Sequence, residues 1–142
     1  MSSRPGASDS WASLFARMKD LRASWPSRGW SWDSRLSCVT SSFSVELEPK
    51  ARSALGIVLL SEWTATSIRR APAGIRELAD RTGGVRSGQS VFARAVAGDS
   101  FAYGLWWPWG DGMTTSMRIG IGGPDATDSA LQELRDAFGV EV

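Results

Sequence analysis

Tryptophan and arginine dominate the residues that could do chemistry. The chain contains eight Trp, fourteen Arg and only two Lys. Three of the indoles, at Trp106, Trp107 and Trp109, surround a proline, and Arg118 follows on the next apolar segment. Indole and guanidinium side chains contribute most to the hot spots of protein-binding surfaces. This composition therefore favours molecular recognition over catalysis.

The residue types that carry most acid–base and metal chemistry are scarce. The chain has no His and a single Cys, Cys38, which excludes the usual general base, an internal disulfide and a Cys-based zinc site. No Ser stands in a Gly-x-Ser-x-Gly elbow. The Gly-rich segment 82–88 lacks the lysine of a P-loop, although Arg86 makes it a candidate anion nest. We expect no enzymatic activity, no metal site and no cofactor.

Residues 101–121 carry the strongest strand pattern. Apolar or Thr side chains recur at every second position from 113 to 121, which is typical of a half-buried strand. An apolar segment, 101–109, precedes it, and Gly110-Asp111-Gly112 lies between the two. These segments predict a β-hairpin in which Gly112 adopts a positive φ.

Side-chain parity predicts the register of this hairpin. A three-residue loop would pair Leu105 with Met117 and gather the apolar side chains on one face, as a half-buried sheet requires. A two-residue loop would pair Leu105 with Arg118 and mix the faces. The three-residue loop is therefore expected, and with it a Trp106 that points outward, diagonal to Arg118.

The predicted binding surface lies near the tip of the hairpin. Trp106 and Arg118 would form its centre, and Trp109 and Asp111 lie at or near the turn. The same parity turns Trp107 and Trp109 toward the core. A stacked Arg–Trp pair that merely closes the outer face of the sheet is the alternative interpretation.

Two more indoles, Trp30 and Trp32, stand in the polar segment 26–35, which we interpret as a loop. They either fold back over the core or form part of a recognition surface, because an indole has both an apolar body and a polar N–H. The sequence leaves both possibilities open.

Apolar spacing predicts helices on either side of the strands. The segment 54–63 fits either a helix or a buried strand. The predicted elements are a helix over 11–25 ended by Pro26, a strand region over 36–47, a helix that begins at Glu48-Pro49, a helix over 73–82 ended by Gly83, a strand over 90–97, the hairpin of 101–121, and a helix from about 124 to 138 capped by Asp125 or Thr127 and ended by Gly139.

This order predicts the α+β class. We expect a two-layer domain whose antiparallel sheet, with a C-terminal three-stranded meander over about 89–121, is covered by N-terminal, central and C-terminal helices. A single domain would span 9–142, after a flexible N-terminus over 1–8. The longest apolar run, 57–60, is far shorter than a membrane span, and no secretory signal is evident, so we expect a cytoplasmic protein with no membrane partner.

One segment resembles a DNA-binding motif. Residues 75–83 resemble the second helix and turn of a helix-turn-helix, which implies a winged DNA-binding protein with helices over about 73–97 and a wing over 101–121. The Arg69–Arg94 region holds six Arg against two acidic residues, a balance that would attract nucleic acid. The segment departs from the motif at Gly84, Gly88 and Gln89, which replace residues suited to a packed recognition helix.

The interpretation that we favour is a non-enzymatic protein-binding module. An adaptor, a chaperone-like protein or a toxin-immunity-type protein would each fit a small α+β domain rich in Trp and Arg. The winged helix-turn-helix protein is the first alternative. A Trp-lined domain that binds a small molecule or a carbohydrate is the second.

Overall fold

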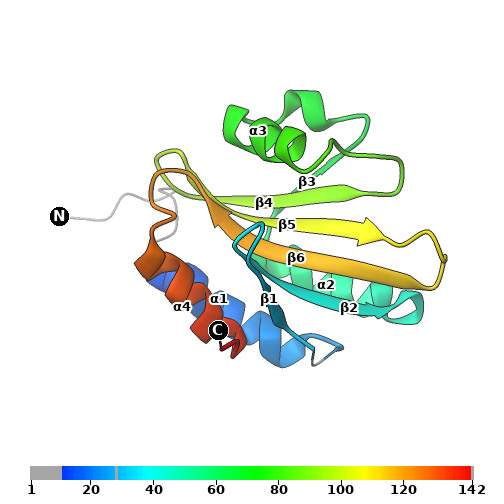
Figure 1. The fold of residues 1–142 in the computed structure, drawn as a ribbon, viewed down its shortest axis with the longest axis horizontal. Helices are drawn as coiled ribbons and strands as arrows, with labels where there is room; N and C mark the ends of the chain where they lie inside the picture. The colour runs from blue at the N-terminus through cyan, green and yellow to red at the C-terminus, as the bar shows by residue number, and fades with distance from the viewer. Residues whose placement is uncertain (1–10, 28, 142) are drawn as a thin grey trace.

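The computed structural model describes residues 11–27 and 29–141 (Figure 1). In chain order the elements are α1 (Trp11–Ser24), β1 (Ser31–Asp33), β2 (Cys38–Ser44), the 3-10 turn η1 (Val45–Leu47), α2 (Glu48–Val58), β3 (Ser61–Thr64), the 3-10 turn η2 (Ile68–Arg70), α3 (Ala73–Arg81), β4 (Ser90–Ala97), β5 (Ser100–Pro108), β6 (Thr114–Gly122) and α4 (Asp128–Phe138). None of the helices in these residues is long and apolar enough to cross a membrane.

The six strands form one antiparallel sheet in the order β1-β2-β6-β5-β4-β3. The predicted meander, now β4, β5 and β6, occupies the middle of this sheet. The hairpin of β1 and β2 extends it on one side, and β3 extends it on the other. The α+β class and the three-stranded meander expected from the sequence are confirmed.

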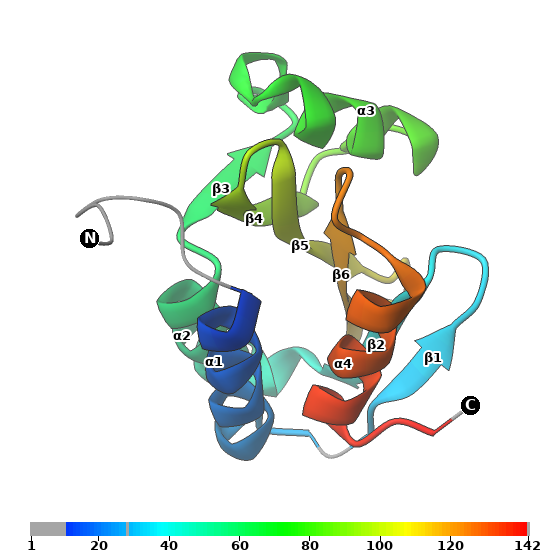
Figure 2. The same cartoon turned by 90° about the vertical axis from the view of Figure 1, so that its left-hand side faces the viewer.

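Helices lie on both faces of the sheet, whereas the sequence interpretation placed them on one (Figure 2). The larger core packs α1, α2 and α4 against one face, with Leu14, Leu55 and Leu134 fully buried. On the other face α3 buries Ile75 and Leu78 in a smaller core. The physical reason lies in β5, which is apolar at nearly every position and therefore buries both of its faces.

The hairpin register predicted from parity is wrong. Leu105 pairs with Arg118, and Trp106 pairs with Met117, so every side chain of β5 faces opposite to the expected side. The loop spans 110–113, and the Trp109 N–H donates to the Thr114 carbonyl at 2.8 Å. Parity determines the register only of a strand with one buried face, whereas β5 is buried on both. Gly112 does adopt the predicted positive φ, at 69°.

The recognition helix required by the DNA-binding interpretation is absent, because residues 90–97 form strand β4. Val91 belongs to the core beneath α3 and Phe92 to the core beneath α2, which is the alternation of a strand buried on both faces. Gly83, Gly84 and Gly88 all have positive φ and end any helix before β4. The helices over about 73–97 that the DNA-binding alternative implies therefore end at Arg81, and the predicted strand over 90–97 is confirmed.

Several boundaries differ from the predicted ones. The ambiguous segment 54–63 is helix up to Val58 and strand from Ser61. The segment interpreted as the loop 26–35 contains the short strand β1, and the expected strand region 36–47 is β2 followed by a 3-10 turn. Thr127, rather than Asp125, caps α4, and Gly139 ends it with φ of 67°. The predicted flexible N-terminus, 1–8, lies outside the described residues.

Candidate functional site

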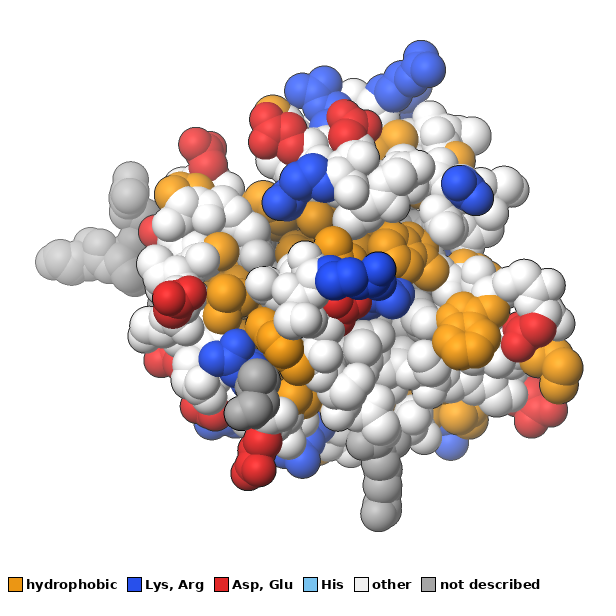
Figure 3. All heavy atoms as spheres, viewed as in Figure 1, with side chains coloured by type: hydrophobic (Ala, Val, Ile, Leu, Met, Phe, Trp, Pro, Cys, Tyr) orange, Lys and Arg blue, Asp and Glu red, His pale blue; other side chains and the backbone are white. Residues whose placement is uncertain are grey.

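One half of the sheet face that carries α3 has no helix over it in the described part of the chain. The helix lies over β3, β4 and β5, whereas β6, β2 and β1 extend beyond it (Figure 2). We call this half the open face, and it consists of Asp33, Thr40, Ser42, Ser44, Trp107, Trp109, Ser116 and Arg118. Ser42 and Ser44 are exposed on it. Part of it is visible in Figure 3, where uncharged polar surface surrounds a small group of basic side chains and apolar patches.

Arg118 forms the centre of the open face. Its guanidinium carbon lies 4.7 Å from the centroid of the Trp107 ring, and its Nε donates to Oδ2 of Asp33 at 3.3 Å. The Arg118 side chain is 19% exposed and that of Asp33 is 11% exposed. The ring below and the carboxylate beside it therefore fix the guanidinium on the sheet.

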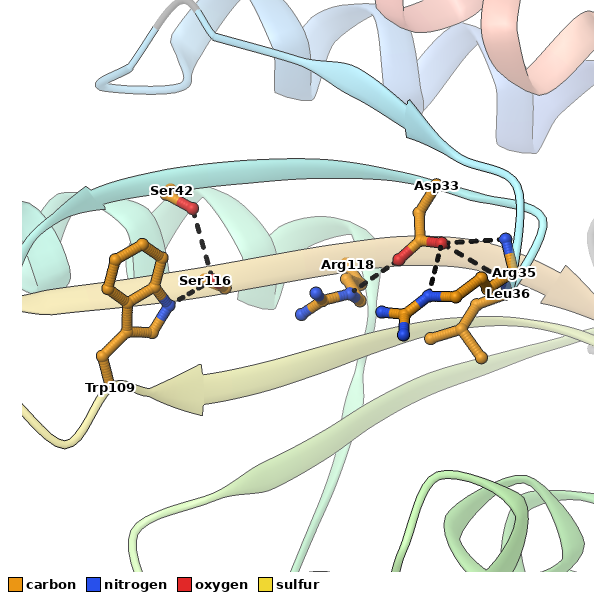
Figure 4. Close-up of polar contacts among 7 residues, drawn as sticks. All are labelled: Asp33, Arg35, Leu36, Ser42, Trp109, Ser116 and Arg118. Carbon is orange, nitrogen blue, oxygen red and sulfur yellow. Dashed lines mark hydrogen bonds and ion pairs between the residues drawn. The ribbon is translucent and has the colours of Figure 1, made fainter.

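Asp33 is held by its own turn (Figure 4). Its Oδ1 accepts hydrogen bonds from the backbone N–H groups of Arg35, at 2.9 Å, and of Leu36, at 3.4 Å. Burial alone would raise the pKa of this carboxyl, but the Arg118 and backbone hydrogen bonds outweigh burial and lower the pKa. Asp33 therefore stays charged at neutral pH and keeps Arg118 in place. The Arg35 guanidinium, 83% exposed, lies 3.8 Å from the same carboxylate.

Trp109 lies at the end of β5 and is 50% exposed. Its Nε1 donates to Oγ of Ser116 at 2.6 Å, and Ser116 in turn contacts the Ser42 hydroxyl at 3.3 Å (Figure 4). The indole is therefore anchored on the open face by its polar atom, while much of its apolar ring remains in water. Met113, across the turn, is 68% exposed.

Asp111 organises the hairpin turn. Its carboxylate accepts from the N–H groups of Met113, at 2.8 Å, and Thr114, at 3.0 Å, and from the Thr114 hydroxyl at 3.1 Å. These hydrogen bonds, that of Met113 foremost, lower its pKa. Its position at the turn matches the sequence prediction, and its contacts hold the loop that presents Met113.

Trp106 is not part of the open face, so the predicted outward pair with Arg118 is wrong. Trp106 is 2% exposed and lies on the opposite side of the sheet. There the Arg52 guanidinium stacks 4.6 Å from its ring centroid, and Phe43 contacts its edge with ring centroids 5.5 Å apart. The sequence did not predict the contact of Arg52 with Trp106, because the spacing of residues along a helix does not indicate which strand the helix covers.

Trp30 and Trp32 fold back over the core, which resolves the alternative that the sequence left open. Both are partly buried against the larger core. The ring centroids of Trp30 and Phe138 are 4.5 Å apart, and the Arg135 guanidinium lies 4.6 Å from the Trp32 ring. These indoles close the end of the α4 layer.

Arg86 is exposed in the loop that joins α3 to β4, and its backbone N–H donates to Oε1 of Gln89 at 2.8 Å. The neighbouring Val85 packs against the core beneath α3, as Trp107 does. Arg86 is therefore a solvent-exposed side chain of this loop, and within the described part of the chain nothing joins it to the network of Arg118.

The single cysteine is buried and is a poor nucleophile at neutral pH. Cys38 is fully buried, and burial raises the pKa of its thiol to about 12. The nearby Tyr103 ring occupies the space that a side chain at Gly120 would fill. Burial raises the pKa of the Tyr103 phenol as well. Neither group is available for nucleophilic or acid–base chemistry near pH 7.

The open face offers a stacked cation, a half-exposed indole and a row of hydroxyls, which are groups that bind rather than react. Residues 11–27 and 29–141 contain no cluster of three or more Cys, Asp or Glu that could hold a metal ion. Comparison of the chain with protein-family models, with curated proteins and with solved structures gives no match.

Proposed function

We propose that this protein is a non-enzymatic protein-binding module that docks on a partner protein through its open face. The observation that carries the proposal is the state of Trp109. Its N–H is already satisfied by Ser116, so what it presents to water is apolar ring surface, and Met113 at the other end of the same turn is also exposed. Covering that surface removes apolar area from water and is favourable.

The rigidity of the open face supports this role. Arg118 is held by Trp107 and Asp33, Trp109 by Ser116, and the turn by Asp111. A partner would therefore meet side chains that have little conformational freedom left to lose, and preorganisation of this kind increases affinity.

The surface chemistry indicates what the partner must offer. An apolar group would cover exposed Trp109 or Met113, and hydrogen-bonding groups would complement the exposed Ser42 and Ser44 hydroxyls, which already contact Ser116 and the Glu46 N–H. An acidic group on the partner would suit Arg35, which is largely exposed. An adaptor, a chaperone-like protein or a toxin-immunity-type protein would each use such a face, and a cytoplasmic location belongs to the same proposal.

Differential capture tests the proposal. The tagged protein and a Trp109→Ala variant are used to capture partners from a nuclease-treated lysate of the source cells, followed by mass spectrometry. The matched control is Leu60→Ala, because Leu60 is also an apolar residue, 64% exposed, but lies before β3 at the other edge of the sheet. We expect a protein that is retained by the wild type and by Leu60→Ala and lost with Trp109→Ala.

Two results would overturn the proposal. One is a partner that binds all three proteins equally or depends on Leu60. The other is the absence of any specific protein at every expression level tested, with the wild type folded by circular dichroism.

A further inference from the structure

A second feature, separate from the open face, lies along α3, from its first turn to Arg81. A cavity of about 640 Å³ opens there between the helix, the end of β4 and the segment that follows β6. Its walls include Trp63, Ala95, Asp99, Phe101 and Glu77. Cavities of roughly 300–1,000 Å³ are those that hold small molecules in proteins.

Small side chains create this space. The first turn of α3 contributes Ala73 and Gly74, and the facing strand β4 contributes Ala93 and Ala95. A Cβ at Gly74 would lie 2.9 Å from the Phe101 ring, so the glycine lets the helix approach that ring closely. The helix rests on the sheet through Ile75 and Leu78 and leaves the volume beside its first turn open.

Two aromatic side chains contribute to the apolar part of the cavity lining. Phe101, from β5, is 8% exposed, and Trp63, from β3, is partly buried. Ring faces attract organic cations as well as flat apolar groups, because the ring quadrupole places negative charge over the face.

Carboxylates dominate the charged part. Glu77 on α3 and Asp99 on the turn between β4 and β5 line the cavity from different elements. In the described residues neither carboxylate has an ion-pair or hydrogen-bond partner, and both side chains are exposed. Arg81 also lines the cavity, one turn after Glu77, and its positive charge acts on the Tyr103 phenol. The acidic groups thus outnumber the basic one.

We infer that this cavity binds a small organic cation, an amine on a flat apolar body. The body would lie against Phe101 and Trp63, and the ammonium group would be held by Glu77 and Asp99. This assignment does not depend on the open face, since it concerns α3 and the part of the sheet beneath it, with no residue shared between the two.

Matched ligands test the assignment by calorimetry and by chemical-shift titration of the folded protein. Tryptamine and benzylamine are the cationic probes, and indole-3-acetate and indole are the anionic and neutral controls. We expect saturable binding of at least one amine at concentrations up to about 10 mM, a range that still detects ligands of a few kcal/mol. We expect indole-3-acetate to bind at least about tenfold more weakly than tryptamine, since a hydrogen bond to a charged group changes affinity by this order.

Three variants locate the binding. Glu77→Gln removes one carboxylate and should weaken tryptamine about tenfold while leaving indole unchanged. Glu133→Gln, an exposed glutamate on α4, is its control and should change nothing. Ala95→Phe fills the cavity from an exposed position and should abolish binding of every probe, with the melting temperature showing that the variant is folded.

The assignment is overturned if no amine binds, if indole-3-acetate binds as tightly as tryptamine, or if binding survives in Ala95→Phe. Equal weakening by Glu77→Gln and Glu133→Gln would also overturn it, because only a general charge effect would remain. None of these results bears on Trp109, so the proposal for the open face stands or falls separately.

Discussion

Two adjacent tryptophans show how differently the two faces of the sheet are used. Trp106 and Trp107 each stack with an arginine, at 4.6 Å and 4.7 Å. The Trp106 ring is sealed between the sheet and α2, whereas the Trp107 ring lies at the border of the open face, partly buried. The same pair of side-chain types therefore closes a core on one face and builds a rigid surface on the other.

The partners of the two arginines sharpen this contrast. Arg52 forms a 3.0 Å ion pair with Glu62, and both side chains are more than one-third exposed. Arg118 pairs with the largely buried Asp33, which two backbone N–H groups also hold. Residue type alone therefore does not distinguish an arginine that covers the core from one fixed on the open face, whereas the burial of its acidic partner does.

The largest expected effect is that of Trp106→Ala. Deleting this buried ring should lower the free energy of unfolding by about 3–5 kcal/mol, because a cavity remains in the larger core. Trp109→Ala should cost about 1 kcal/mol or less, since that ring is half exposed and loses one hydrogen bond. Urea unfolding followed by circular dichroism measures both. Similar losses for the two variants would remove the distinction between the faces.

A smaller difference is expected within the Arg118 network. Asp33→Ala should cost about 3 kcal/mol, because it leaves Arg118 and two backbone N–H groups without their acceptor. Arg118→Ala should cost about 1–2 kcal/mol, because Asp33 keeps both of its backbone donors. The same unfolding assay compares the variants, and a larger loss for Arg118→Ala would show that its stacking on Trp107 outweighs its role as a partner of Asp33.

The smallest expected effect is a change in how stability depends on pH in acid. The pKa of Asp33 is lower in the folded chain than in the unfolded chain, so its stabilising contribution is complete above the unfolded pKa of about 4 and is lost as the pH falls through the folded value. Stability measured between neutral and acidic pH should therefore fall less steeply in Asp33→Asn than in the wild type.

Asp111→Asn is the matched control for this titration. Asp111 also has a lowered pKa, but it is exposed and Asn keeps a carbonyl that can accept the turn hydrogen bonds. Because Asn does not titrate, the stability of Asp111→Asn should also fall less steeply in acid than that of the wild type, and this variant measures how much of the Asp33→Asn effect any hydrogen-bonded turn carboxylate would give. An identical profile for Asp33→Asn and the wild type would mean that the Asp33–Arg118 contact contributes nothing to the stability of the open face.

The helices and the meander could be predicted from the sequence because they follow local rules. The apolar stripe from Leu14 to Leu21 has helical spacing, and all four of its buried members lie in the core. Pro49 near the start of α2 and Gly139 after α4 are boundary signals that act within one turn. Such features need no knowledge of what lies across the sheet.

The candidate site could not be predicted in the same way because it depends on which faces are covered. The parity of β6 is clear, but β5 carries apolar side chains at both parities, so the sequence is compatible with either register. In the structure α3 covers the second face and buries Leu105 there, so the neighbouring Trp106 faces the larger core on the opposite side. Asp33 reaches Arg118 from a position 85 residues earlier, a contact that no local pattern indicates.

Chemical-shift changes of the indole N–H groups upon addition of the captured partner test the account most directly. Trp107 and Trp109 face the proposed interface, whereas Trp106 lies on the other side of the sheet and serves as an internal reference. We expect the Trp107 and Trp109 signals to shift or broaden while the Trp106 signal stays unchanged. Changes confined to Trp106, or to residues around Leu60, would contradict it.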